Sequence, residues 1–344
     1  MSRTVVGVDI GTSSLRAVEL QDADKPKPIV LRFDELPLPP GAVRGGEVVE
    51  PNTVATSLKR LWSQAGFRSK DVVLGMGNQR VLVRDLSVPR MSIERIRESL
   101  PFLVQDLLPV PVADAVLDFY PVTEVDGDSG PLVSGLLVAA VKEGVLANVR
   151  AAQLAGLTPL AVDLLPFALS RAIGSGGSGT IALVDVGAAT TNVLITRDGV
   201  PQFARIIPAG GDDLTLALST QLGVPPEDAD RIKRTLGLAS SKNLPEEHRP
   251  AVEVIYGVTS ELLGGIRNTI GYFTNLRELT SIDRIVLSGG GAQLPGFFRA
   301  LSELTLVPVV DGDPFQAVTR ARGARPDGGV SMAVALGLAL GSAA

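Results

Sequence analysis

The chain has 344 residues, of which 45% are hydrophobic and 20% are charged, and its formal net charge is −5. These values are typical of a soluble globular protein with a substantial core, and without a Lys/Arg-rich block they argue against nucleic acid as a partner. The chain has no cysteine, which excludes disulfides, thiol catalysis and Cys-ligated metals. Its single histidine, His248, lies among charges and prolines, which excludes Ser–His catalysis and His-rich zinc sites.

Neither end of the sequence predicts a membrane segment. The N-terminal apolar run is short and is broken by Asp9, so it does not have the form of a signal peptide. No stretch reaches the roughly 18 to 20 uninterrupted apolar residues of a membrane span. The apolar residues 332–344 are too few to cross a bilayer and lack the basic face of a membrane-surface helix. We therefore expect a cytoplasmic protein without direct membrane insertion.

The first half of the chain alternates strand and helix patterns. Residues 4–10 and 14–20 predict a hairpin, and Ser92 and Pro101 mark the N-cap and a kink or split of a helix. The other predicted elements are strands at 28–38, 71–77 and 81–89, a helix at 53–67, a hairpin at 115–125 and 131–141, a helix at 142–156, a strand ending at Asp163 and a helix from Pro166. The glycine- and serine-rich residues 174–179 predict a flexible hinge.

The second half begins with a strand and turn that resemble the first hairpin. Residues 181–196 read "IALVDVGAATTNVLIT", and further strands lead to a helix that starts near Asp212. The remaining predicted elements are helices at 225–237 and 257–280, a strand–glycine loop–helix at 283–305 and a buried helix at 330–341.

The stretches "VDIGTSSLR" and "VDVGAATTN" form a repeat. Asp9 and Asp185 are 176 residues apart, and the same offset aligns Gly11 with Gly187 and Ser14 with Thr190. A single motif of this kind is as easily a β-hairpin with a polar tip, but two copies half a chain apart indicate two similar lobes that face each other.

The residues of both turns suit a bound phosphate. Backbone N–H groups in a glycine turn can form an anion-binding nest, and the hydroxyls of the turn can donate to phosphate oxygens. Carboxylates at the same tips would hold a magnesium ion, mostly through water, and the ion would bridge to the phosphate. The hydroxyl candidates are Thr12, Ser13, Ser14, Thr190 and Thr191, and the carboxylates are Asp9 and Asp185.

Two further glycine runs precede helices. "VLSGGGAQLPGF" at 286–297 and "IPAGGDDLT" at 207–215 would let a ligand approach the backbone closely. For Asp212 and Asp213 the simplest reading is a helix N-cap, so the glycines are the better candidates for ligand contact.

Together these stretches resemble the actin-like ATPase superfamily, in the order of its two phosphate motifs, its connecting helices ("AVDLLPFALSRA" and "SMAVALGLAL") and its adenosine motif. Within this superfamily, the chain resembles the PilM family of pilus-assembly proteins, which are FtsA-like. The stretches that carry this likeness include "SVPRMSIERIRESLPFLVQDLLPVPVADAVLDFYPV", "ARIIPAGGDDLTLAL" and "PPEDADRIKR". The resemblance covers most of the chain. It implies an α/β, ribonuclease H-like fold of two lobes with duplicated mixed sheets and nucleotide in the cleft between them.

The resemblance also implies domains and site residues. The first lobe would span 1–175 with a small inserted subdomain near 80–140, and the second 180–344 with an insertion near 212–256. ATP and Mg²⁺ would be the cofactors, with Asp9 and Asp185 on the metal side. The nucleotide side would comprise Gly11, Thr12, Ser13, Ser14, Gly187, Thr190, Thr191, Gly210, Gly211, Lys233, Gly289, Gly290 and Gly291.

Family likeness further implies an adaptor that binds the short cytoplasmic N-terminal tail of a PilN-like inner-membrane protein and links it to the pilus motor. Such a protein would lie at the inner face of the membrane through its partner, with contacts to other inner-membrane and motor components and self-association as further options. The alternatives are an FtsA-like polymerising division protein and, with less support, a small-molecule kinase. An FtsA-like protein would usually end in an amphipathic membrane helix, a pattern not found after residue 340.

Fast hydrolysis is not expected. It needs a polar residue that orients a water in line with the terminal phosphate, and the first connecting segment offers only Asp163, which equally suits capping of the next helix. The second phosphate loop has Ala188 and Ala189 where the first has Thr12 and Ser13. These features favour a nucleotide-binding adaptor with slow or no turnover.

Overall fold

The computed structural model describes residues 4–128, 130–174, 178–238, 245–276, 281–316, 318–321 and 329–341. One lobe is built on a six-stranded mixed sheet with the strand order β10-β6-β1-β2-β3-β16, in which β1 is antiparallel to β2 and parallel to β6. Its strands are β1 (Thr4–Ile10), β2 (Ser14–Gln21), β3 (Ile29–Pro37), β6 (Asp71–Met76), β10 (Thr158–Leu164) and β16 (Thr319–Arg320).

The second lobe repeats this architecture. Its sheet has the order β13-β12-β11-β14-β15, which matches β3-β2-β1-β6-β10 of the first. Its strands are β11 (Thr180–Val186), β12 (Thr191–Arg197), β13 (Val200–Ile207), β14 (Arg284–Ser288) and β15 (Val309–Asp311). The predicted two-lobed α/β fold with duplicated mixed sheets is therefore confirmed.

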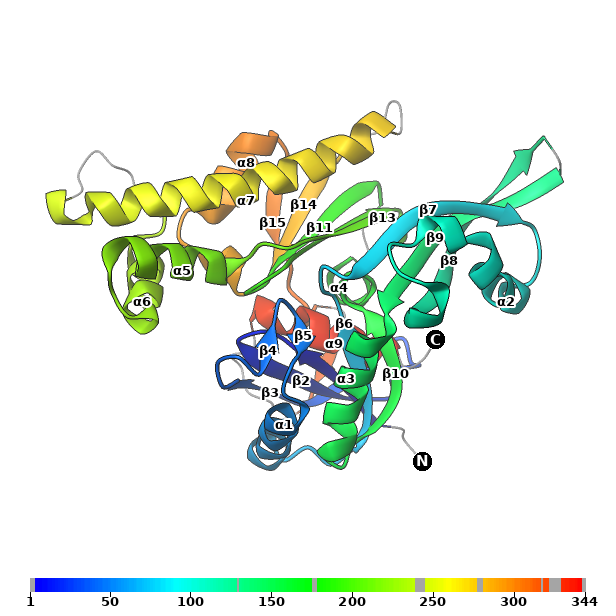
Figure 1. The fold of residues 1–344 in the computed structure, drawn as a ribbon, viewed down its shortest axis with the longest axis horizontal. Helices are drawn as coiled ribbons and strands as arrows, with labels where there is room; N and C mark the ends of the chain where they lie inside the picture. Colours follow the sequence, from blue (N-terminus) through cyan, green and yellow to red (C-terminus); the bar gives the residue numbers. More distant parts are fainter. Residues whose placement is uncertain are drawn as a thin grey trace.

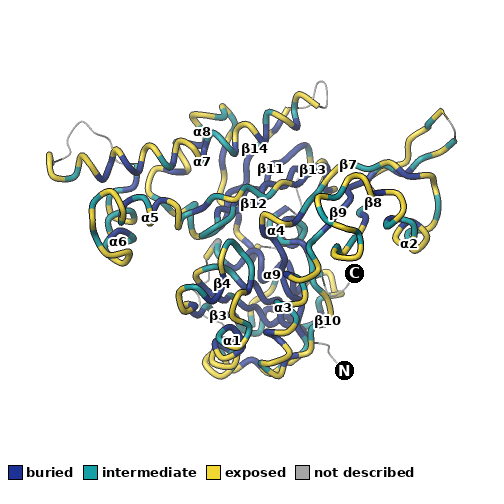
Figure 2. The backbone as a smooth tube through the Cα atoms, viewed as in Figure 1, coloured by how far each residue is buried: buried dark blue, intermediate teal, exposed yellow. Residues whose placement is uncertain are grey.

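Alternation along the strands explains how helices cover both faces of the first sheet. On β1, Val5 faces α4 (Leu165–Ile173) and α9 (Ala333–Leu340), while Val6 and Val8 face α1 (Pro51–Ala65) and α3 (Lys142–Leu154). The cluster around α4 and α9 also contains Leu183 and Leu194 of the second sheet. The two connecting helices thus lie between the two sheets, and Figure 2 shows α9 as a buried element.

The outer side of the second lobe is helical. A 28-residue helix, α7 (Arg249–Leu276), and α8 (Phe297–Thr305) pack on the outer face of its sheet, and α5 (Gly211–Leu222) and α6 (Pro226–Leu236) pack against α7 (Figure 1). The sequence predicted a start near residue 257 for this helix. It begins eight residues earlier, at Arg249. Pro250 does not prevent this start, since proline is compatible with the first turn of a helix.

An inserted unit projects from the first lobe between β6 and α3 (Figure 1). Strands β7 (Val81–Pro89), β8 (Ala115–Gly127) and β9 (Gly130–Val141) form an antiparallel sheet in the order β7-β9-β8, and α2 (Ile93–Leu103) packs on it. A short hairpin of β4 (Val43–Arg44) and β5 (Glu47–Val48) lies elsewhere in the first lobe. The predicted domain limits remain a prediction, and residues 175–177 of the predicted hinge lie outside the described residues.

Two details of the helices refine the sequence expectations. Ser92 caps α2 as predicted, because its side chain accepts a hydrogen bond from the Arg95 N–H. Pro101 lies inside α2, which ends two residues later, and a separate 3₁₀ turn at Gln105–Leu107 follows. Within the described residues, no helix combines the length and the apolarity that a membrane crossing requires.

Candidate functional site

The hairpin turns that join β1 to β2 and β11 to β12 have the same geometry. The Gly11 N–H donates to the Ser14 carbonyl at 3.0 Å, and the Gly187 N–H donates to the Thr190 carbonyl at 2.9 Å. A Cβ atom added to either glycine would lie 2.9 Å from that carbonyl oxygen, which is too close for any side chain. The half-chain repeat of the sequence is therefore a structural repeat, and the glycine in each turn is required by close packing.

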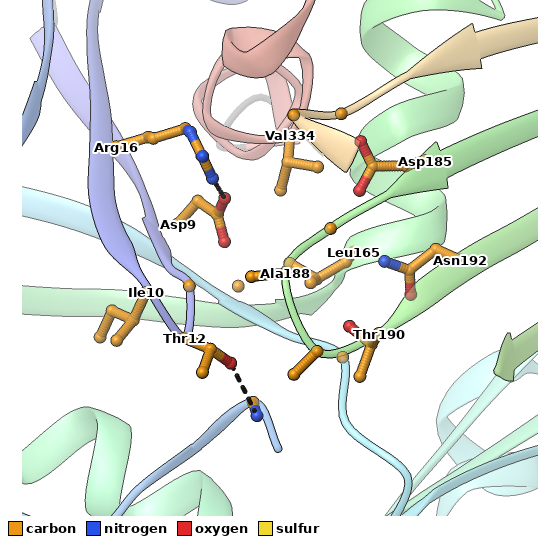
Figure 3. A pocket seen from close by; sticks show the side chains of 18 of the residues that line it. Asp9, Ile10, Thr12, Arg16, Leu165, Asp185, Ala188, Thr190, Asn192 and Val334 are labelled. Carbon is orange, nitrogen blue, oxygen red and sulfur yellow. Dashed lines mark hydrogen bonds and ion pairs between the residues drawn. The ribbon is translucent and has the colours of Figure 1, made fainter. Parts of the chain in front are cut away.

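Both turns border one small pocket between the lobes (Figure 3). The figure shows Asp9 and Thr12 on one side of it and Asp185, Ala188 and Thr190 on the other. The predicted residues that line it are Asp9, Gly11, Thr12, Ser13, Asp185, Gly187, Thr190, Gly289 and Gly290. Residues that are remote in sequence thus meet at one point.

A second, larger cavity of about 680 Å³ adjoins the first and shares Ser13, Gly187 and Gly290 with it. Its volume lies in the range of small-molecule sites. Apolar side chains such as Leu262 and Leu294 form part of its wall. Of the predicted residues, it is lined by Ser13, Ser14, Gly187, Gly210, Gly211, Lys233, Gly290 and Gly291.

Three glycines at the boundary of the two cavities have different surroundings. A Cβ atom at Gly210 would overlap the Ala188 carbonyl oxygen, and one at Gly289, whose φ is +93°, would overlap the backbone of Val186. Gly290 has open space around its would-be Cβ. Glycine is thus needed at the first two positions for packing, whereas the backbone at Gly290 is open to a ligand.

The predicted N-cap at Asp212 or Asp213 is wrong in detail. Gly210 is the N-cap of α5, and Asp213, at the third helical position, accepts a hydrogen bond from the Gly210 N–H at 2.8 Å. Glycine at the N-cap allows the close approach of the Ala188 carbonyl, and the Asp213 carboxylate satisfies the free N–H of Gly210.

Lys233 contacts the cavity wall with its ammonium group. Its Nζ donates to the Gly211 carbonyl at 3.0 Å and to Thr215 Oγ1 at 2.6 Å, and it pairs with Asp230 at 2.9 Å. The ammonium therefore links α6 to the start of α5, and Asp230 also lines the cavity.

Three predicted residues have other partners. The Thr191 hydroxyl donates to the Ala209 carbonyl at 2.8 Å, and the Ser14 hydroxyl donates to Glu35 at 2.6 Å. Asp163 accepts from the Leu164 N–H and pairs with Arg171, which also donates to the Gly337 carbonyl. Thr191 and Asp163 line neither cavity, so the structure does not bring them together with the rest.

Arg16 and Asn192 line the first pocket but were missed from sequence. Arg16 is the cross-strand neighbour of Asp9, and Asn192 is that of Asp185. The signal was available, because the two residues are separated by the same 176 positions as the two aspartates. Arg16 pairs with Asp9 at 3.5 Å and with Glu35 at 2.9 Å (Figure 3 shows the first contact).

The pocket shifts the pKa values of its charged side chains. Burial raises the pKa of Asp9 to about 6, an effect that Arg16 opposes and that the charge of Asp185 reinforces. Burial also raises the pKa of Asp185, against the charge of Arg16 and hydrogen bonds from Ser288 and Asn192. Burial lowers the pKa of Arg16, but Asp9 and Glu35 outweigh this and raise it overall. Such shifts are typical of functional sites.

The residues of the first pocket fit a hydrated magnesium ion and a phosphate. Among the residues that the structure describes, three buried polar side-chain atoms lack a hydrogen-bond partner, and two of them, Arg16 Nε and Asn192 Oδ1, belong to this pocket. No group of three or more His, Cys, Asp or Glu side chains suited to a metal occurs in the described ranges. Two carboxylates and an amide oxygen suit Mg²⁺, which keeps several water ligands.

Comparisons with known proteins agree with this geometry. A family model described as type IV pilus assembly protein PilM matches residues 7–343. A solved structure of a PilM–PilN type IV pilus biogenesis complex is 28% identical with a TM-score of 0.85, over 99% of this chain and 98% of that one. The ethanolamine utilization protein EutJ of Carboxydothermus hydrogenoformans has the same fold, with 18% identity and a TM-score of 0.59 over 98% and 89% of the two chains.

A curated relative lies in the cell-division family. The protein FtsA of Bacillus subtilis is 23% identical over 73% of this chain, and the match spans 62% of the length of that protein.

Proposed function

The chain belongs to the PilM family of type IV pilus assembly proteins. From this membership we propose that it is a nucleotide-binding adaptor that binds a PilN-like membrane protein. The facing pair of glycine turns, with Asp9 and Asp185 at one pocket, is the observation that supports the nucleotide half. The similar solved complex, which contains PilN, supports the partner half.

The two cavities divide the nucleotide between them. The phosphates lie at the two turns, where backbone N–H groups and the hydroxyls of Thr12, Ser13 and Thr190 donate to them. Asp9 and Asp185 would hold Mg²⁺ through water, and a bound ion would offset the negative charge of the phosphates. The adenosine part occupies the larger cavity beside Gly210, Gly211, Lys233 and Gly291.

The pocket is poorly equipped for hydrolysis. Leu165 and Val334 line it at the connecting helices, and Asp163, the predicted water-orienting residue, is paired with Arg171 (Figure 3 shows Leu165 and Val334). An aliphatic side chain cannot orient an attacking water. We expect ATP turnover below about 1 per second, the low end of typical enzymes. A phosphate-release assay with purified protein would reveal faster turnover, which would contradict an adaptor role.

The adaptor binds the extended cytoplasmic tail of its partner on the first lobe and the inserted unit. The insertion carries exposed apolar side chains at the end of α2, in the 3₁₀ turn that follows and at the start of β8. Phe102 is 84% exposed, and Leu103, Leu107 and Val116 are partly exposed. Apolar anchors of a peptide would bury these groups. The protein would then be held at the inner face of the membrane by its partner.

Replacement of Phe102 tests this surface. We expect Phe102→Ser to weaken binding of a fluorescent peptide from the N-terminal tail of the cognate PilN-like protein by at least about 10-fold, because exposed aromatic anchors dominate such interfaces. Leu306→Ser is the matched control, since Leu306 is 89% exposed on the second lobe. Polarisation with and without Mg²⁺–ATP measures both variants. Equal affinities of the two variants would place the peptide elsewhere.

An FtsA-like polymerising role remains the alternative, because FtsA proteins are curated relatives at 23% identity. It predicts filaments in the presence of ATP, which pelleting and electron microscopy would detect. An adaptor stays in the supernatant at the same protein concentration.

A further inference from the structure

Glu35 and Asp9 share the guanidinium of Arg16 beside the first phosphate turn, where Arg16 Nη1 lies 3.6 Å from the position that a Cβ atom would take on Gly11. Glu35 and Arg16 face each other directly on β3 and β2, and the Arg16 guanidinium pairs with Glu35 at 2.9 Å. The Glu35 carboxylate is fixed in turn by the Ser14 hydroxyl, which donates to it at 2.6 Å. Arg16 lines both cavities, whereas Glu35 lines only the larger one. The guanidinium is thus shared between Asp9 in the pocket and Glu35 at its rim.

The charges of this group do not balance. Arg16 pairs with two carboxyl groups, Asp9 and Glu35, and a third, Asp185, lines the same pocket, so three carboxyl groups surround one guanidinium. A phosphate that enters without a cation meets an excess of negative charge, and in a partly buried site this repulsion is only weakly screened. Arg16 is the one cation among the residues that line the first pocket.

We propose that Glu35 is a positioning residue that keeps the charge of Arg16 paired beside the phosphate turn and thereby makes nucleotide binding depend on a divalent cation. This role rests on the proposed nucleotide site. When Mg²⁺ is present, the ion neutralises Asp9, Asp185 and the phosphates, and the nucleotide binds while Arg16 stays paired. When Mg²⁺ is absent, Arg16 is the cation of the first pocket that could offset the phosphate charge, and Glu35 competes for it.

A structural role explains Glu35 less well. Its side chain is 38% exposed, and exposed ion pairs contribute about 0 to 1 kcal/mol to stability. The packing of β3 comes from other residues: Phe33, on the same face as Glu35, packs in the cluster around α4 and α9, and Leu36 packs on the opposite face. Glu35→Gln keeps the shape of the side chain and an oxygen that accepts from Ser14, so the fold is preserved while the charge is lost.

The test compares nucleotide affinity with and without metal. Isothermal titration calorimetry at pH 8 measures ATP binding in Mg²⁺ and in EDTA for the wild type, Glu35→Gln, Arg16→Gln and the double variant. ATP carries about twice the net charge of its Mg²⁺ complex, so we expect Glu35→Gln to tighten metal-free binding about 10-fold and Mg²⁺–ATP binding about 3-fold. The ratio of the two dissociation constants should therefore fall about 3-fold.

The control separates this role from a general charge effect. Glu303→Gln removes the same charge from an arginine pair on α8, Arg299–Glu303, and should leave the ratio unchanged. In the Arg16→Gln background, Glu35→Gln should change either affinity by less than about 2-fold, because the cycle isolates coupling between the two residues.

The outcomes distinguish the two claims. If the wild type binds ATP but Glu35→Gln leaves the ratio unchanged, or acts equally without Arg16, the role of Glu35 is overturned and the nucleotide site stands. If the wild type binds ATP in neither buffer, the proposed site is wrong, and the role of Glu35 is overturned with it.

Discussion

Asp9→Asn is expected to weaken magnesium-dependent nucleotide binding strongly and at the same time to stabilise the ligand-free protein. Asn cannot supply the negative charge that holds hydrated Mg²⁺, and loss of a carboxylate that acts on a metal through water costs about 10- to 100-fold in affinity. Titration calorimetry with Mg²⁺–ATP measures this loss. An unchanged affinity would remove Asp9 from the metal site.

The stability gain follows from the pKa of Asp9. The pKa is about 6 in the folded protein and 3.8 in its ordinary environment, so the folded state retains the proton over a range where the unfolded chain has lost it. Stability therefore falls as the pH rises from about 4 to 6, by about 3 kcal/mol in total, and stays lower above that range. Asp9→Asn lacks this titration.

Urea unfolding from pH 4 to pH 8 tests this expectation. The variant should be more stable than the wild type at pH 7.5 by up to about 3 kcal/mol, and the difference should vanish near pH 4. A less stable variant at pH 7.5 would mean that the contact with Arg16 outweighs burial. A carboxylate kept at a cost in stability is expected where it serves function.

The repeat in the sequence predicted both turns and the pocket they share. Each turn is specified by its local sequence. A carbonyl oxygen lies so close that only glycine fits in the turn, and apolar residues alternate in the flanking strands. The same regularity would have identified Arg16 and Asn192, because the offset of 176 residues also links these two.

Partners from other elements could not be predicted in this way. Ser14 has the residue type of a phosphate donor, but its hydroxyl is bonded to Glu35, and that contact depends on the register of β3 against β2. Asp163 has the residue type of a catalytic group, but Arg171 lies two turns along the next helix and pairs with it. A sequence pattern identifies the type of a side chain, whereas tertiary packing determines which group forms a hydrogen bond or an ion pair with it.

The second large effect is expected at the contact between the connecting helices α4 and α9. Gly337→Ala should destabilise the protein by at least about 3 kcal/mol, because a Cβ atom there would overlap the Ala168 carbonyl oxygen on α4 and two helix backbones would have to separate. On β1, Gly7 is in the same situation against α9, where its Cβ would overlap the Ala335 carbonyl oxygen. The contact between α4, α9 and β1 is therefore backbone against backbone.

Gly264→Ala is the matched control, since Gly264 lies inside the long helix α7 and its would-be Cβ has open space around it. There alanine should stabilise the protein by up to about 1 kcal/mol, its advantage over glycine in a helix. Thermal and urea unfolding of both variants measures the two signs. A neutral Gly337→Ala would mean that α4 and α9 can separate without cost, whereas a large loss would mean that the two helix backbones are held in direct contact.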